Sequence, residues 1–471
     1  MLVMKFGGTS VGSQEAFRQV IKIVQDALTR DPQVVVVVSA MSGVTNALIE
    51  GATAASRGDH ETYQRLKSEL LSRHLSTVDQ LSLSPAMRLD VSGHIEDRLH
   101  DFDRFCRSVA ILRELTPRGL DLISALGERL SVVMIAAALS SAGIKAQAVE
   151  ATELIVTDDN FGQASPLMEE TKARTEARLG ALLARGIVPV VTGFIGATPE
   201  GVTTTLGRSG SDYTAAILGA CLAATEIYIW KEVDGIMTAD PRIVKEAYTL
   251  PEMTYAEAAE LAYFGAQVLH PKTIAPAAEL GIPLRTVNTF NPAHPGTVLV
   301  RERQNTDKRP IQAVSVIKAL SLITVEGRGM LGVPGIAART FAAVARRNAN
   351  VLMISQSSSE QHICFVVPLA AAKGVIESLE DELRLEMLKQ NIDRIGQQAE
   401  VAIVAVVGEG IAYTPGVAAQ IVGALGKRRI NIVAVAQGSS ACNFSMVVDI
   451  KDADDAVRAI HQDVLMPING S

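Results

Sequence analysis

Short apolar runs separated by polar turns recur through the first 230 residues of this 471-residue chain. Runs rich in β-branched and other apolar side chains predict buried strands, and they lie at residues 1–6, 33–39, 186–196 and 226–230. Helical spacing or alanine-rich composition predicts helices between them, over residues 13–28, 47–55 and 213–224. Strands that alternate with helices in this way predict an α/β fold with a mostly parallel central sheet flanked by helices.

Two further changes of pattern indicate how the chain is divided. Residues 60–116 are rich in charged side chains, and apolar residues recur among them at helical spacing. We therefore expect a helical insertion at about 55–116. Prolines and charges concentrate near 291–311, where we expect a domain boundary.

The C-terminal part contains an internal repeat. The block "VEGRGMLGVPGIAARTFAAVARRNANVLMISQSSS" from Val325 aligns without a gap with "VVGEGIAYTPGVAAQIVGALGKRRINIVAVAQGSS" from Val406. The matched pairs are Gly335 with Gly416, Asn350 with Asn431, and Gln356 with Gln437. Two copies of a strand–loop–helix–strand unit with a polar Asn/Gln/Ser end favour a ligand site between them over a merely duplicated scaffold.

The domains predicted from these patterns are a catalytic domain at 1–300, a linker at 301–315, and two small modules at 316–395 and 396–471, which can be interleaved. A length of 471 residues agrees with about two to four domains.

Composition excludes several classes of function. The formal net charge is −7 and no basic block occurs, which argues against nucleic-acid binding. The four cysteines match neither a zinc pattern nor a disulfide framework, so a reducing compartment fits. We identify no apolar run of membrane-spanning length and no targeting segment, and expect a soluble, cytoplasmic protein.

The first candidate for chemistry is the turn "MKFGGTS" at residues 4–10, between the first strand and the first helix. Gly7 and Gly8 predict a backbone-lined anion pocket, although Gly-Gly also occurs in ordinary tight turns. Lys5 favours the pocket, because an ammonium group at the end of an apolar strand must reach solvent or an anion. The turn lacks the GxxxxGK[ST] pattern and is not a P-loop.

A second glycine-rich loop, "TTTLGRSGSDYTAA", leads into a helix N-terminus, which attracts anions. Arg208 can bind a carboxylate through two parallel hydrogen bonds. Asp212 alone would suggest an N-cap, but beside Arg208 and Ser211 we interpret it as part of a site.

A third loop, "WKEVDGIMTADPRIV", contains Asp240-Pro241-Arg242, which suits either a turn or a nucleotide clamp. Fixed N–H donors and cations at one sheet edge are what phosphoryl transfer requires, since its catalysis is mostly positioning and charge stabilisation.

Six motifs along the chain together resemble those of a known family. "KFGGTSVG", "VVSAMSGVTN", "SALGERLS", "GFIGATPEGVTTTLGRSGSDYTAA", "VDGIMTADPR" and "FGAQVLHPKT" are similar, in order, to the motifs of aspartate kinases. The repeated tail resembles the paired ACT modules of the same enzymes. The resemblance implies the amino-acid-kinase fold, two ferredoxin-like ACT modules, and transfer of phosphate from ATP to the side chain of L-aspartate. That reaction is the entry step to lysine, threonine and methionine.

The resemblance also implies roles for residues at matching positions. Lys5 matches the lysine that bridges the phosphates and Asp212 the aspartate that orients it. The implied aspartate contacts are Thr45, Glu128 (to the α-ammonium), Arg208 (to the carboxylate) and Ser211. The implied ATP contacts are Lys5, Phe6, Gly7, Gly8, Lys231, Glu232, Met237 and Arg242. No protein metal-ligand cluster is expected, and Mg²⁺ would be carried on the nucleotide.

The residues agree with this chemistry. The nucleophile would be the substrate's own carboxylate, which is ionised at pH 7 and needs no strong general base. That fits the lack of a His-based constellation, and His270 has no assigned role. The chain departs from the family at Lys231-Glu232, where many members have Thr-Asp, and at Gln267, where many have lysine. Lys231 or Lys272 is a candidate to replace the missing charge.

The paired modules suggest feedback inhibition by an end-product amino acid. "MISQSSSE" and "VAQGSS" resemble the threonine-responsive branch, so we expect threonine, with lysine second, near Asn350, Gln356, Asn431 and Gln437. We expect a monofunctional enzyme that forms a homodimer or homotetramer through its ACT modules.

Two other functions remain open. One is another kinase of the same fold, acting on glutamate, carbamate or UMP. The other is a catalytically inactive amino-acid sensor, which the presence of Lys5, Arg208 and Asp212 disfavours.

Overall fold

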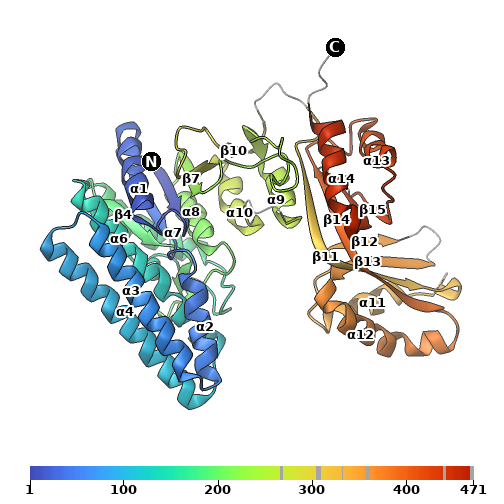
Figure 1. The fold of residues 1–471 in the computed structure, drawn as a ribbon, viewed down its shortest axis with the longest axis horizontal. Coiled ribbons are helices and arrows are strands. Elements are labelled where there is room, and N and C mark those ends of the chain that lie inside the picture. The colour runs from blue at the N-terminus through green and yellow to red at the C-terminus, as the bar shows by residue number, and fades with distance from the viewer. Residues whose placement is uncertain (266–268, 304–308, 331–332, 357–360, 439–441, 467–471) are drawn as a thin grey trace, which may run out of the picture. The chain divides into compact units, whose positions relative to one another are not determined.

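The computed structural model describes residues 1–265, 269–303, 309–330, 333–356, 361–438 and 442–466, so Gln267 lies outside the described residues. The chain forms two compact units (Figure 1). The first unit comprises residues 1–236, 249–255 and 269–303, and the second comprises the described residues of 237–248, 256–268 and 304–471.

The first unit is built on an eight-stranded sheet of order β3-β4-β2-β1-β7-β9-β10-β8, in which only β9 and β10 pair antiparallel. This agrees with the mostly parallel sheet expected from the sequence. Its strands are β1 (Leu2–Phe6), β2 (Val34–Val38), β3 (Ala146–Val149), β4 (Val188–Thr192), β7 (Glu226–Lys231), β8 (Glu252–Thr254), β9 (Leu284–Asn288) and β10 (Thr297–Val300). The helices of the unit are α1 (Gln14–Arg30), α2 (Val44–Ser56), α3 (His60–Gln80), α4 (Pro85–Leu112), α5 (Pro117–Ser124), α6 (Leu126–Ser141), η1 (Ala151–Glu153), α7 (Met168–Leu183), α8 (Gly210–Cys221) and α10 (Pro271–Leu280).

Strand β1 is the centre of this sheet. It pairs with β2 on one side and β7 on the other, and all five of its residues are buried. Side chains alternate along a strand, so Met4 and Phe6 pack in the core with α1 and α6, whereas Lys5 points to the opposite face, toward α8. The central strand therefore delivers one ammonium group to the face that α8 covers.

The predicted strand at 186–196 is wrong in its extent. It is two strands, β4 and the short β5 (Ile195–Ala197), which pairs with β6 (Thr203–Thr205) in a separate hairpin. The break falls at Gly193-Phe194. A Cβ on Gly193 would lie 2.5 Å from the Ser211 Cβ, and Phe194 has a φ of 70°. The chain leaves the sheet there because α8 approaches it closely.

Two long helices, α3 and α4, lie within the range predicted as a helical insertion. The two helices run side by side next to α2 (Figure 1). Ser84 caps α4 and Asp59 caps α3, in each case by accepting a hydrogen bond from a backbone N–H in the first turn.

Among the described residues, one stretch, 117–141, is long and apolar enough to cross a membrane by length and composition, contrary to the sequence expectation. It consists of α5 and α6, and 83% of its apolar window is buried inside the protein. This is the burial of a core helix that packs against the sheet.

The second unit contains a six-stranded antiparallel sheet of order β12-β13-β11-β14-β16-β15. The two 14-residue strands at its centre, β11 and β14, each contribute to both apolar cores of the unit: Val314 and Val404 lie in one core, and Ile323 and Ile395 pack in the other. The strands are β11 (Ala313–Glu326), β12 (Met353–Gln356), β13 (His362–Pro368), β14 (Arg394–Val407), β15 (Ala434–Ala436) and β16 (Asn443–Asp449). The helices are α9 (Tyr255–Tyr263), η2 (Arg328–Met330), α11 (Ile336–Ala345), α12 (Leu369–Leu388), α13 (Val417–Lys427), η3 (Ile450–Asp452), α14 (Ala453–Ile460) and η4 (His461–Leu465).

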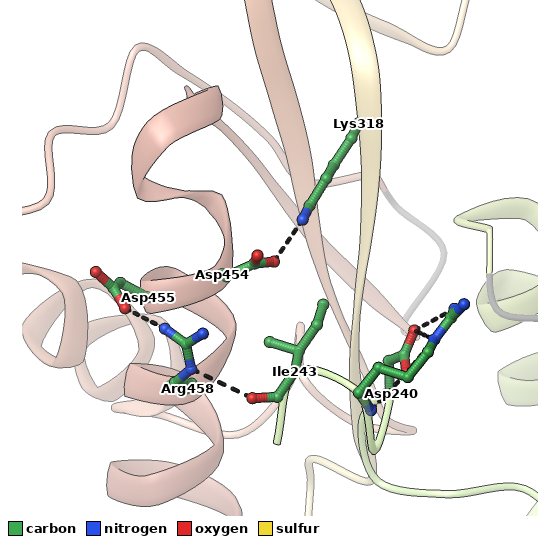
Figure 2. Close-up of polar contacts among 7 residues, drawn as sticks. Asp240, Ile243, Lys318, Asp454, Asp455 and Arg458 are labelled. Carbon is green, nitrogen blue, oxygen red and sulfur yellow. Dashed lines mark hydrogen bonds and ion pairs between the residues drawn. The ribbon is translucent and has the colours of Figure 1, made fainter. Parts of the chain in front are cut away.

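Residues 237–248, which sequence analysis assigned to the catalytic domain, group with the second unit. Ala239 and Val244 are part of its apolar core, and the Val314 amide donates to the Thr238 carbonyl. Figure 2 shows Arg458 of α14 donating through Nε to the Ile243 carbonyl at 3.2 Å. The segment is thus held by both packing and polar contacts within this unit.

Candidate active site

A buried carboxylate between two lysines forms the centre of the candidate site. The Nζ of Lys5 lies 2.5 Å from the Asp212 Oδ1, and the Nζ of Lys231 lies 3.7 Å from its Oδ2. Lys5 is the second-to-last residue of the central strand β1, Lys231 is the last residue of β7, and Asp212 lies in the first turn of α8. The carboxyl ends of adjacent parallel strands thus bring both lysines to one carboxylate, at the sheet edge where ligands bind in such folds.

Charge balance explains why the three groups remain together. Burial opposes ionisation of Asp212, but Lys5 and Lys231 outweigh it and lower the pKa of the carboxyl. Burial lowers the pKa of Lys231, and Asp212 counteracts that effect. The cluster thus holds two lysine side chains around one buried carboxylate, and cationic groups in such a position suit an anionic ligand.

The glycine turn packs tightly against the loop after β2. A Cβ on Gly8 would lie 2.8 Å from the Ala40 carbonyl oxygen, so a side chain does not fit there. The sequence predicted that the backbone of this turn lines an anion pocket. The Gly7 amide instead donates to the Trp230 carbonyl at 3.2 Å, so it is not available to an anion. A Cβ on Gly7 would lie 3.7 Å from the Lys5 Nζ, so the glycine keeps the space beside the ammonium group open.

Glu128 lies in the first turn of α6 and is fully buried. Its Oε1 accepts from the Ala40 amide at 3.1 Å, while its Oε2 has no hydrogen-bond partner among the described residues. Burial raises the pKa of Glu128 to about 8, with Ala40 and the charge of Lys5 acting in the opposite direction. A buried carboxylate with one unpartnered oxygen is suited to receive a cationic group.

Thr45, in the first turn of α2, lies beside the start of α6. A Cβ on Gly127 would be 3.5 Å from the Thr45 Oγ1. Thr45 thus lies near the residue that precedes Glu128.

Arg208 is exposed in the loop before α8, and Ser211 is buried in the first turn of that helix. His270, the N-cap of α10, lies close enough to Arg208 for its charge to act: burial, Lys272 and Arg208 together lower the pKa of His270. An exposed guanidinium on the loop that leads to Asp212 can meet a carboxylate from solvent.

The three threonines before this loop are anchors rather than ligand donors. The Thr203 Oγ1 accepts from Arg129 at 3.4 Å, and the Thr204 and Thr157 hydroxyls lie 2.7 Å apart. The Thr205 hydroxyl donates to Asp121 at 2.7 Å. Sequence reasoning missed Asp121, for which the signal was a carboxylate among the apolar residues Leu120, Leu122 and Ile123.

Several predicted nucleotide contacts have other surroundings. The Phe6 ring is fully buried and stacks on Trp230 with centroids 5.9 Å apart, which leaves its side chain no exposed surface. The Glu232 carboxylate accepts from the Thr9 hydroxyl at 2.9 Å. Met237 and Arg242 belong to the second unit, where the exposed Arg242 guanidinium is paired with Asp240.

Of the predicted effector residues, Gln356 lines a cavity of about 340 Å³ in the first repeat. Met330, Gly335, Ile336 and Ile363 also line it, and Gly335, with a φ of 90°, is the N-cap of α11. Asn350, Asn431 and Gln437 are exposed. Within the described part of the chain, no group of three His, Cys, Asp or Glu side chains is arranged to hold a metal ion.

Comparison with known proteins places residues 237–248 with the first family match, although they group with the second compact unit. Residues 1–288 match the Amino acid kinase family, and residues 323–383 and 404–464 match an ACT domain. Aspartokinase 3, chloroplastic, of Arabidopsis thaliana is 33% identical over 464 residues, which cover 98% of this chain and 80% of that protein. Bifunctional aspartokinase/homoserine dehydrogenase 1 of the same plant is 37% identical over 465 residues. The chain spans about half the length of such bifunctional relatives.

Two solved structures are similar over nearly the whole chain. Aspartokinase III of E. coli in complex with aspartate and ADP (R-state) has a TM-score of 0.81 and 29% sequence identity, covering 99% of this chain and 100% of that one. The same enzyme in complex with lysine and aspartate (T-state) has a TM-score of 0.79.

Proposed function

The chain belongs to the aspartokinases of the amino acid kinase family, and we propose that it transfers the γ-phosphoryl group of ATP to the side-chain carboxylate of L-aspartate. The products are 4-phospho-L-aspartate and ADP. The observation that carries the proposal is the buried Lys5–Asp212–Lys231 cluster at the carboxyl ends of β1 and β7.

The cluster supplies what two anionic reactants need. An ionised carboxylate and a polyphosphate repel each other, and the ammonium groups of the cluster offset that repulsion. Lys5 is the group we assign to the phosphates, with Asp212 holding its Nζ in place and Lys231 providing the second cation. Mg²⁺ would be held mainly by the nucleotide phosphates and would neutralise part of their charge.

The aspartate side of the proposal uses residues of α2, α6 and the loop before α8. Glu128 binds the α-ammonium through its unpartnered Oε2. Arg208 binds the α-carboxylate, and Thr45 and Ser211 line the same side. The side-chain carboxylate attacks the γ-phosphorus, the bond to the bridging oxygen breaks, and ADP leaves with that bond's electron pair. No proton is removed from the nucleophile, so no general base is required.

Aspartyl phosphate reacts with hydroxylamine, which provides the direct test of the activity. With ATP, Mg²⁺, aspartate and hydroxylamine, we expect one aspartyl hydroxamate for each ADP released. Glutamate, carbamate and UMP in place of aspartate should give little ADP. Efficient turnover of one of them without aspartate turnover would identify another kinase of this fold, and no ADP release with any of them would indicate a sensor.

The raised pKa of Glu128 predicts a specific pH dependence. Below pH 8 its carboxyl is mostly protonated in the free enzyme and cannot pair with the α-ammonium. We therefore expect kcat/KM for aspartate to rise about tenfold per pH unit from pH 6.5 toward 8. Glu128→Gln should be about 10–100-fold lower at pH 8 and nearly flat in pH.

The control for this measurement is the KM for ATP, which should stay within about twofold in Glu128→Gln. A variant that keeps the wild-type slope in kcat/KM for aspartate would show that another group titrates.

We further propose feedback inhibition by an end product of the pathway to lysine, threonine and methionine, with threonine favoured and lysine second. The cavity at Gln356 supports a small amino acid, because its described lining is mostly apolar and the Gln356 amide can both donate and accept. We assign Asn350, Asn431 and Gln437 to the same regulatory function by their positions in the repeat. We also expect two or four copies to assemble through the ACT modules.

Inhibition assays test this assignment. Millimolar threonine should lower the initial rate, and Gln356→Ala should raise the half-inhibitory concentration about tenfold by removing a hydrogen bond to the effector. Gln398→Ala, at an exposed position of β14 in the same unit, is the matched control and should leave it unchanged. Full activity of the wild type in millimolar threonine and millimolar lysine would contradict the proposal.

The cysteines support a reducing compartment such as the cytoplasm. All four lie within the described residues and none forms a disulfide. Burial raises the pKa of the Cys106 thiol to about 12 and that of Cys221 to about 11, which keeps both protonated and unreactive.

A further inference from the structure

Asp121 is a buried carboxylate on α5 that connects three segments of the first unit. Its Oδ2 accepts from the Gly162 amide and from the Thr205 amide, both at 2.9 Å. Its Oδ1 accepts from the Thr205 hydroxyl at 2.7 Å. A buried carboxylate with three N–H or O–H donors is well satisfied, and losing one donor leaves charge unpaired in the interior.

The two ends of this connection lead to the two sides of the candidate site. Asp121 precedes Glu128 by seven residues on the consecutive helices α5 and α6, which are separated only by Ala125. Thr205 precedes Arg208 by three residues and ends β6. Asp121 therefore joins the helices that carry Glu128 to the loop that carries Arg208.

The third segment, residues 162–164, contacts the same loop. The Ala164 amide donates to the Thr205 carbonyl at 2.9 Å, and a Cβ on Gly207 would lie 3.0 Å from the Gly162 carbonyl oxygen. Gly162 and Gly207 have φ values of 85° and 78°, in the region that favours glycine. The path of the chain from Thr205 to Arg208 is thus fixed by residues 162–164. Asp121 accepts hydrogen bonds from both segments, through the Gly162 amide and the Thr205 amide.

We propose that Asp121 is a positioning residue that sets the distance between the ammonium-binding and carboxylate-binding groups of the site, and so controls affinity for aspartate. The inference rests on the proposed function, because Glu128 and Arg208 receive their roles there. Asp121 does not touch the reacting atoms. Its effect is to fix two groups on different elements to a spacing that fits one amino-acid backbone.

Thr205→Val provides the cleanest test, because valine keeps the shape and the backbone amide and removes only the hydroxyl that donates to Asp121. We expect the KM for aspartate to rise about tenfold, with kcat and the KM for ATP within about twofold of the wild type. Thr205→Ser restores the hydroxyl and should restore the KM.

Thr204→Val is the matched control. It removes one buried hydrogen bond, to Thr157, from the neighbouring residue of the same strand and does not touch Asp121. Its melting temperature should fall about as much as that of Thr205→Val, but its aspartate KM should stay within about twofold of the wild type. This comparison separates positioning from general loss of stability.

Asp121→Ala should act in the same direction as Thr205→Val and more strongly, because it removes the acceptor for the Gly162 amide, the Thr205 amide and the Thr205 hydroxyl at once. If that variant does not fold, Thr205→Val alone decides the question. An active wild type together with an unchanged aspartate KM in folded Thr205→Val overturns the inference while leaving the proposed function intact. A wild type that makes no aspartyl hydroxamate overturns both.

Discussion

The structure depends on one buried ionic arrangement, in which Asp212 lies between Lys5 and Lys231. Two ammonium groups at the ends of adjacent buried strands would repel each other strongly without it. The side chains of Lys5 and Asp212 are only 8% and 6% exposed, so water screens the pair little. Asp212 offsets the repulsion between the two ammonium groups, so both remain together at the candidate site.

The fold places these groups with little freedom. Lys5 is fixed by pairing of β1 with strands on both sides, and Asp212 is fixed because α8 packs against the same strands. Glycines at 8 and 193 allow the turns and α8 to approach within distances that a side chain would prevent. The charged groups of Lys5, Lys231 and Asp212 are thus positioned by strands and a helix. The exposed Arg208 lies on a loop, whose conformation is fixed by contacts with other segments.

Much of this could be predicted from sequence. The uninterrupted valines at 34–38, the capping serine before α1 and the glycine turn after Lys5 have strong local signals. Other features could not be predicted because they depend on contacts between residues distant in sequence. These are the break at Phe194, the donors that surround Asp121, the hydrogen bond from the Gly7 amide to Trp230, and the grouping of 237–248 with the second unit. The repeat predicted two modules, but not that β11 and β14 each contribute to both apolar cores of the second unit.

The most direct measurement is the turnover of Lys5→Met in a sample whose folding is verified by circular dichroism and melting temperature. The cluster predicts that kcat for aspartyl phosphate formation falls about 100- to 1,000-fold, as for other preorganised groups that stabilise transition-state charge. Lys22→Met, an exposed change on α1, is the control and should keep full activity. Wild-type turnover in folded Lys5→Met would contradict the account.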